Sequence, residues 1–283
     1  MKKLLLSILT LLCFNPSAYP NDFDTNALTK SKSLKNIPYG QHPQQVMDVY
    51  FPAKLLTEST PAPLIVMVHG GAWTIGDKNN AAVVKNKIDY WTKQDWIFIS
   101  INYRLLPDVS LQQQAQDIAE ALIYIQNQAH HWHADSKRLV LMGHSSGAHL
   151  VSLLTTRPLW LVSQPQSWRA TIALDSAAYN VEKIMRSPHA RFYDRAFGDQ
   201  PLNWKALSPT SQLHQTLPAF LAVCSTIRAD QPCTQAQQFI QQAQKLGTKA
   251  QLLPVPLSHI EINKSLGKNN PYTQAVNQFI QTH

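Results

Sequence analysis

Hydrophobic and polar positions along this chain fall into alternating blocks, with short apolar runs separated by segments of helical spacing. Runs without an interposed polar face are typical of strands buried on both sides in a parallel sheet. Such runs lie at 64–68, 96–101, 138–142, 171–174, 220–223 and 252–255, and an early strand at 46–51 can pair with one near 34–39. The alternation of strands and helices predicts an α/β protein with a doubly wound sheet.

Local signals mark where several of the helices begin and end. Ser110 and Gln113 have the spacing of a capping box, and Pro271 suits the first position of a final helix. Gly247 ends a helix that the pattern predicts from Thr234 to Leu246. The helix after Ser110 carries an apolar face that we expect to pack on the sheet, made of Leu111, Ala115, Ile118, Leu122 and Ile125.

The segment Gly-His-Ser-Ser-Gly-Ala-His at 143–149 joins the apolar run at 138–142 to a stretch with helical spacing. Two glycines flank Ser145 in a G-x-S-x-G pattern, which occurs by chance in unrelated proteins but here stands between a strand and a helix. A sharp strand-to-helix turn needs glycines because a Cβ would collide with neighbouring backbone, and it leaves the serine Oγ exposed at the top of the sheet. The sequence therefore predicts that Ser145 is a nucleophile.

A second glycine segment follows the apolar run at 64–68, where the chain reads His-Gly-Gly-Ala-Trp at 69–73. A turn of this kind can free backbone amides to bind the oxyanion of a tetrahedral intermediate. We assign this role to the amides of Gly71 and Ser146, with Ala72 as the alternative to Gly71. The competing interpretation is that the glycines only close a turn after a strand.

The order of these segments, together with Asn-Tyr-Arg-Leu-Leu-Pro at 102–107 and a late histidine, resembles the α/β-hydrolases of the esterase/lipase type. The resemblance is closest to carboxylesterase-like and arylformamidase-like members and covers residues 40–283. It implies an eight-stranded, mostly parallel sheet with helices on both faces, and a triad in the chain order serine, acid, histidine. Ala72 departs from the glycine that many lipases carry there, which leaves the exact oxyanion donor open.

The catalytic base needs a histidine that follows the last strand and can reach Ser145. His259 follows the apolar run at 252–255 and is the best placed of the eleven histidines. We expect His69 and His144, beside the two glycine motifs, to be hydrogen-bonding scaffold residues. Three histidines at 130–133 lack cysteine or acidic partners at ligand spacing, so we predict no metal site and no organic cofactor.

The acid of the triad must orient the imidazole from a loop after a neighbouring strand. Asp230 follows the strand at 220–223 and is our first candidate, although relatives often have His-Gly before this aspartate and this chain does not. Asp175, at the end of the strand at 171–174, is the rival because a minority of the family carries its acid there. The alternative role for Asp230 is a solvated carboxylate that caps the next helix.

The connection at 176–217 is much longer than an ordinary link between strands and is rich in aromatic residues. A long segment in a compact domain is usually a lid or a binding loop. We predict a cap over Ser145, and the alternative is a surface excursion whose aromatic residues only pack on the body of the domain. These aromatic residues are Tyr179, Phe192, Tyr193, Phe197 and Trp204.

The N-terminus has the charged, apolar and small-residue regions of a secretory signal peptide, which we place at 1–20, before a hydrolase domain at 21–283. Its apolar stretch is too short to span a membrane, and no other stretch is long enough. Removing two lysines with the leader lowers the net charge from +8 to +6. The basic residues are scattered, which does not favour nucleic-acid binding. We expect a periplasmic or secreted protein.

Only Cys224 and Cys233 remain after the leader is removed. In an oxidising compartment an even pair is usually joined, so we predict a disulfide that closes the loop containing Asp230. Two unpaired thiols are the alternative.

Together these features predict a serine hydrolase that cleaves small carboxylic esters through an acyl-enzyme. The alternatives are amide or formamide hydrolysis of the arylformamidase type, or an inactive hydrolase-like binding protein. A large oligopeptidase is not favoured, because the chain offers no room for its extra domain. Neither the acyl and alcohol groups nor the oligomeric state follow from the sequence.

Overall fold

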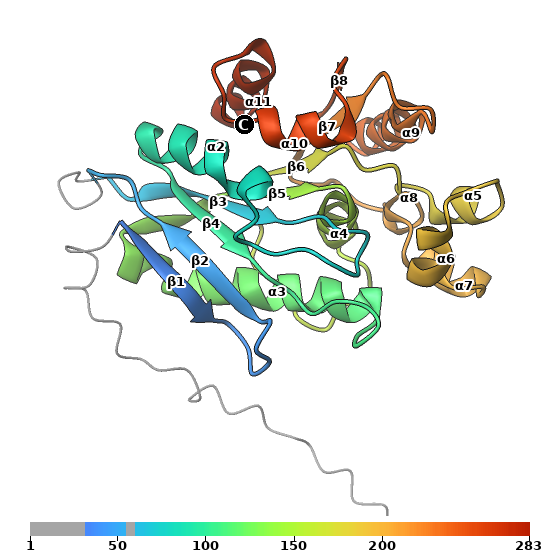
Figure 1. Cartoon of the computed structure of the whole chain (residues 1–283), viewed down its shortest axis with the longest axis horizontal. Helices are drawn as coiled ribbons and strands as arrows, with labels where there is room; N and C mark the ends of the chain where they lie inside the picture. The colour runs from blue at the N-terminus through green and yellow to red at the C-terminus, as the bar shows by residue number, and fades with distance from the viewer. Residues whose placement is uncertain (1–31, 55–59) are drawn as a thin grey trace, which may run out of the picture.

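The computed structural model describes residues 32–54 and 60–283, so the expected signal peptide lies outside the described residues. Its centre is an eight-stranded sheet in the order β1-β2-β4-β3-β5-β6-β7-β8 (Figure 1). The two pairings of β2 are antiparallel and all others are parallel, which confirms the predicted sheet. The strands are β1 (Ser33–Pro38), β2 (Val46–Tyr50), β3 (Ala62–Val68), β4 (Ile97–Ile101), β5 (Ala134–His144), β6 (Ala170–Leu174), β7 (Ala219–Ser225) and β8 (Ala250–Val255).

Helices cover both faces of this sheet (Figure 1). One face packs against α3 (Leu111–Gln128), α4 (Ser146–Thr155) and α9 (Pro232–Lys245). The other packs against α2 (Ala81–Trp91), α10 (His259–Ser265) and α11 (Pro271–Thr282). The strands that end at the two glycine motifs, β3 and β5, are therefore covered by helices on both faces.

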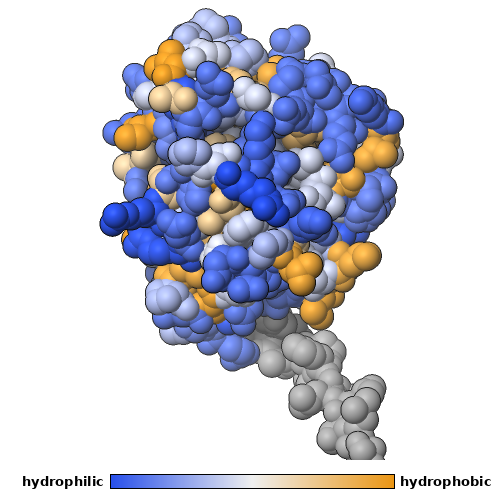
Figure 2. All heavy atoms as spheres, turned by 90° about the vertical axis from the view of Figure 1, so that its right-hand side faces the viewer, coloured by the Kyte–Doolittle hydropathy of each residue, from blue (hydrophilic) through white to orange (hydrophobic). Residues whose placement is uncertain are grey.

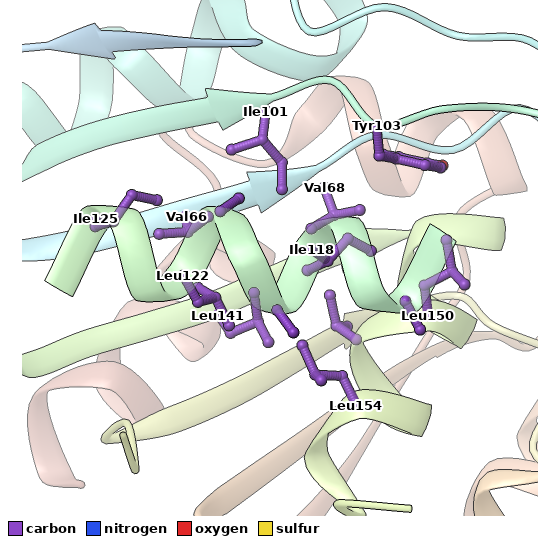
Figure 3. Packing of buried hydrophobic residues seen from close by; sticks show 14 of the residues in the cluster. Val66, Val68, Ile101, Tyr103, Ile118, Leu122, Ile125, Leu141, Leu150 and Leu154 are labelled. Atoms are coloured by element: carbon purple, nitrogen blue, oxygen red, sulfur yellow. The ribbon is translucent and has the colours of Figure 1, made fainter. Parts of the chain in front are cut away.

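The predicted apolar face of α3 is buried against the sheet. Figure 3 shows Ile118, Leu122 and Ile125 of this helix in the same cluster as Val66 and Leu141, and all five side chains are fully buried. Full burial of an aliphatic side chain of this size contributes about 1.5 to 3 kcal/mol. The capping box at the start of α3 forms as predicted, with Ser110 Oγ accepting from the Gln113 amide.

Helix α2 has no counterpart among the predicted elements, because a lysine interrupts its apolar face. Lys87 is buried beside Trp91, and its Nζ donates to the carbonyl oxygen of Asn263 at 2.6 Å and to Asn263 Oδ1 at 2.9 Å. Burial lowers the pKa of Lys87 to about 7. The lysine ties α2 to α10, which is a contact between distant parts of the chain that no local pattern indicates.

The long connection between β6 and β7 folds into four short helices grouped at one end of the sheet (Figure 1). They are α5 (Val181–Met185), α6 (Arg191–Phe197), α7 (Pro201–Ala206) and α8 (Pro209–Gln212). Figure 2 shows that this side of the molecule is mostly hydrophilic, with hydrophobic residues in small separate groups. Among the aromatic residues of the 176–217 segment, Tyr179 and Phe197 are buried, and Phe192, Tyr193 and Trp204 are partly buried. No helix among the described residues is long and apolar enough to cross a membrane.

Candidate active site

Ser145 stands at the turn between β5 and α4 with a φ of 57° and a ψ of −120°. A Cβ added to Gly147 would lie 2.4 Å from the carbonyl oxygens of Val68 and His69, and the turn could not keep this shape. The amide of Ser145 donates to the carbonyl of Leu174 at 2.9 Å, which ties the turn to the neighbouring strand. The backbone therefore holds the serine side chain at the carboxyl edge of the sheet, as predicted.

His259 meets this serine from the other side of the site. Its Nε2 lies 2.8 Å from Ser145 Oγ, and its Nδ1 lies 2.6 Å from Asp175 Oδ2. The carboxylate can only accept, so Nδ1 carries the proton and Nε2 is left to accept the serine hydroxyl. His259 is the first residue of α10 instead of a loop residue, and the capping box between Ser258 and Glu261 holds that helix start in place.

Asp175 follows β6 with a φ of 57°, and its side chain is 0% exposed. The carboxylate accepts three hydrogen bonds, from His259 Nδ1, from Arg228 Nη1 at 2.7 Å and from the Ser225 amide at 2.8 Å. Burial raises the pKa of Asp175, but the hydrogen bond from His259, the Arg228 charge and the Ser225 amide together hold it below its ordinary value. The residue is thus ionised beside the imidazole.

Asp230, the first candidate for the acid, does not contact His259. Its side chain is 49% exposed and binds Arg228, accepting from Nε at 2.9 Å and from Nη2. In the loop after β7, Arg228 lies next to the imidazole, and Asp230 lies on the far side of Arg228. The prediction that Asp230 lies beside the histidine is therefore wrong. Asp175, the rival candidate at the end of β6, occupies that position. The signal in the sequence was an aspartate that ends a strand next to the serine strand.

The loop after β3 presents the other expected groups. Gly71, Ala72 and Trp73 have φ values of 135°, 49° and 61°, a succession of left-handed residues that turns the backbone sharply. Within residues 32–54 and 60–283, the amides of Gly71 and Ala72 donate no hydrogen bond. Ser146 opens α4, where the first amides have no partner inside the helix. Gly71, Ala72 and Ser146 line the same cavity as Ser145.

That cavity has a volume of about 580 Å³ and a largely apolar lining. Trp73 forms one wall with Phe192 and Tyr193 from α6, at ring-centroid distances of 6.4 and 6.0 Å. Trp73 Nε1 donates to His149 Nδ1 at 3.2 Å, and His149 Nε2 donates to the Leu207 carbonyl at 2.8 Å. Burial lowers the pKa of His149 to about 4, so it is neutral. The wall therefore joins the loop after β3 to the 176–217 segment.

The two histidines beside the glycine motifs are scaffold residues, as expected. His144 Nε2 donates to the carbonyl of His259 at 3.0 Å, and burial lowers the pKa of His144 to about 3. His69 Nδ1 lies 2.9 Å from the carbonyl of Gly70, and burial lowers its pKa as well. Both imidazoles are neutral near pH 7 and hold backbone around the site.

The predicted bridge between Cys224 and Cys233 is present, with the two Cα atoms 5.2 Å apart. It joins the end of β7 to the start of α9 and closes the loop that carries Arg228 and Asp230. What the bridge fixes next to His259 is therefore Arg228, because Asp230 lies behind it.

Two family models match the sequence. The prolyl oligopeptidase family model matches residues 108–280, which is more than half of the chain, and the BD-FAE model matches residues 47–159. The chain belongs to the prolyl oligopeptidase family, within the α/β-hydrolases of the esterase/lipase type. The match contains the serine turn, both aspartates and His259.

The curated proteins that this chain resembles include several esterases. An isoprenylcysteine alpha-carbonyl methylesterase of Arabidopsis thaliana is 25% identical over 240 residues, covering 77% of this chain and 54% of its own. The esterase LipQ of Mycobacterium tuberculosis is 26% identical, covering 66% and 47%. A kynurenine formamidase of Salmo salar is 25% identical, covering 44% and 39%. The chain spans about half the length of the first of these curated relatives.

Solved structures confirm the fold. Esterase B from Lactobacillus rhamnosis superposes with a TM-score of 0.71 at 23% identity, covering 88% of this chain and 87% of its own. At this identity the likeness is one of architecture, and it agrees with the eight-stranded sheet described above.

Proposed function

We propose that this protein hydrolyses carboxylic esters of small molecules through an acyl-enzyme. The observation that carries the proposal is the continuous hydrogen-bonded chain from Ser145 Oγ through His259 to Asp175, at the floor of a largely apolar cavity. The esterases among its relatives support the same reaction class.

In this mechanism His259 Nε2 takes the hydroxyl proton as Ser145 Oγ attacks the ester carbonyl carbon. Asp175 holds the imidazole in the required tautomer and stabilises the imidazolium that forms. The imidazolium then protonates the leaving alcohol, which departs and leaves the acyl group on Ser145. A water molecule, deprotonated by the same nitrogen, attacks the acyl carbon, and the imidazolium returns that proton to Ser145 Oγ as the bond to the serine breaks and the acid is released.

The negative oxygen of each tetrahedral intermediate needs donors that are already in place. We assign this role to the amide of Ser146 and to that of Gly71 or Ala72, because all three residues line the cavity together with Ser145. A donor of this kind is commonly worth about 3 to 4 kcal/mol of transition-state stabilisation. No step of the proposed reaction needs a metal or an organic cofactor.

We also propose that residues 176–217 act as a cap over the site. Phe192 and Tyr193 of α6 support this role, since they form a cavity wall with Trp73 and are not packed only on the body of the domain. The aromatic wall favours substrates with an apolar acyl or alcohol group over strongly polar ones.

Export to the periplasm or beyond the cell is part of the proposal. The bridge between Cys224 and Cys233 supports it, because disulfides persist in oxidising compartments. Determining the N-terminal residue of protein purified from the exported fraction tests the expected leader at 1–20. An N-terminus that still begins at Met1 would contradict it.

Hydrolysis of an amide or formamide is the second candidate, favoured by the likeness to a kynurenine formamidase. A panel of p-nitrophenyl esters of increasing acyl length, an aryl formamide and a prolyl dipeptide amide separates the candidates. We expect the highest kcat/KM on a short or medium acyl ester. A higher value on the formamide or the peptide would replace the proposed substrate class, and no turnover of any compound would favour an inactive binding protein.

A further inference from the structure

Arg228 occupies a place in this site that the serine mechanism does not itself require. It lies in the loop closed by the disulfide, its side chain is 20% exposed, and it lines the cavity. Its Nη1 donates to Asp175 Oδ2 at 2.7 Å, the oxygen that also accepts from His259 Nδ1 at 2.6 Å. Two donors converge on one oxygen, which explains why Nη1 and Nδ1 lie only 3.1 Å apart.

The opposite edge of the guanidinium binds Asp230. Nε donates to Asp230 Oδ1 at 2.9 Å and Nη2 donates to Asp230 Oδ2. Arg228 therefore lies between two carboxylates. Asp175 is buried and orients the imidazole, whereas Asp230 is half-exposed and does not contact the imidazole. Its planar fork suits this bridging, and a lysine could not reproduce it.

We propose that Arg228 is a positioning residue that sets the pH range of the enzyme, and that Asp230 moderates it. This inference rests on the proposed function, in which His259 must be unprotonated to accept the proton of Ser145. A cation 3.1 Å from Nδ1 opposes the formation of an imidazolium, so Arg228 keeps His259 able to accept at lower pH. Asp230 partly offsets that cation from behind.

Other titratable groups lie around the triad, and all are left unchanged in the variants below: the His144 ring lies 4.6 Å from that of His259, Tyr193 lines the same cavity, and the charge of Asp175 acts on Tyr272. His144 is neutral, and burial raises the pKa of Tyr193 to about 12 and that of Tyr272 well above its ordinary value, so both phenols are neutral too. Burial lowers the pKa of Lys87 to about 7, and its charge helps to lower the pKa of His144. Differences in the pH profile between the variants therefore report the effect of Arg228 and Asp230 alone.

The test is the pH dependence of kcat/KM on the best ester substrate, measured on the mature chain and on Arg228→Met, Arg228→Lys and Asp230→Asn. We expect the acid limb of the profile to move to higher pH by about one unit in Arg228→Met, as for loss of a neighbouring charge. It should move by a few tenths of a unit to lower pH in Asp230→Asn, because Arg228 is then no longer offset. Arg228→Lys should keep the limb close to its original position while kcat falls by about tenfold.

A loss of structure would lower kcat, but it would not move the acid limb in opposite directions in Arg228→Met and Asp230→Asn. Opposite shifts would therefore reflect the charges that the two substitutions remove. An acid limb that stays in place in Arg228→Met, or that moves the same way in both variants, would overturn the inference. If Arg228→Met does not fold, Asp230→Asn carries the test, and an unmoved limb there overturns it. A fluorophosphonate probe distinguishes the two levels: no labelling of the unaltered enzyme refutes the proposed function, whereas labelling with unmoved limbs refutes only the role of Arg228.

Discussion

The serine side and the acid side of this site are built on different principles. On the serine side, Ser145, Ser146 and the glycines that shape the turn lie within five consecutive residues at the end of β5. On the acid side, Asp175, Arg228 and His259 each follow a different strand, and they meet only when the sheet forms. One side is encoded by local sterics, and the other by the order of strands.

This difference explains where substitutions act. A change on the serine side alters a reacting atom or the backbone around it. A change on the acid side alters how the imidazole is held, and there two carboxylates, Asp175 and Asp230, bind the two hydrogen-bonding edges of the Arg228 guanidinium. Substitutions should therefore have the largest effect at the nucleophile and smaller effects at the groups that hold the imidazole.

Ser145→Ala should abolish ester hydrolysis, with kcat reduced by about 10⁶-fold, since the nucleophile itself is lost. Covalent labelling by a fluorophosphonate, followed by mass spectrometry, measures the same event directly. Ser146→Ala is the matched control, because its Oγ is buried beside the Tyr103 hydroxyl and only its amide is assigned a role. Labelling that survives in Ser145→Ala would show that another residue is the nucleophile.

Asp175→Asn should reduce kcat by up to about 10⁴-fold, because an amide favours the wrong imidazole tautomer. Asp230→Asn is the matched substitution one hydrogen bond further from His259, and it should cost less than about tenfold. Steady-state kinetics with circular dichroism on both variants measures the contrast. The reverse ranking would return the acid to Asp230 and contradict the geometry described above.

Removing the bridge between Cys224 and Cys233 should lower the free energy of unfolding by about 2 to 3 kcal/mol, the value that chain entropy gives for a short closed loop. Denaturant titration of a Cys224→Ala, Cys233→Ser double variant measures it. We also expect kcat to fall, since the bridge closes the loop that carries Arg228. The native protein should contain no titratable thiols in its mature part, and reductant should leave the double variant unaffected.

Asp175 should also contribute to the pH dependence of stability. Its pKa is lower in the folded protein than in the unfolded chain, so its contribution is fully present above about pH 4 and is lost as the pH falls through the folded value. Denaturant titrations at pH 5 and pH 3 should therefore show a smaller loss of unfolding free energy in Asp175→Asn than in the unaltered protein. An identical loss in both would contradict the shift. Asp230→Asn, at the half-exposed carboxylate, serves as the comparison.

The sequence by itself determined the features that depend on short-range sterics and on burial. Gly143 and Gly147 stand where a side chain would strike backbone, so the turn around Ser145 follows from residue types a few positions apart. Continuous apolar runs specified the strands, because only a strand covered on both faces can be apolar throughout. His259 was found because it follows the last of these runs.

Only the tertiary structure decided which groups surround His259. Asp175 lies 84 positions from His259 and Arg228 lies 31 from it, and no local pattern says which side chain reaches the imidazole. The sequence favours a carboxylate after β7 over one after β6, yet the loop after β7 places Arg228 next to the imidazole and Asp230 on the far side of Arg228. The same holds for Lys87, whose burial depends on carbonyl oxygens from α10. A contact between residues far apart in the sequence depends on the order of the strands and on which side chain occupies the available position. Neither can be predicted from the two residues in contact.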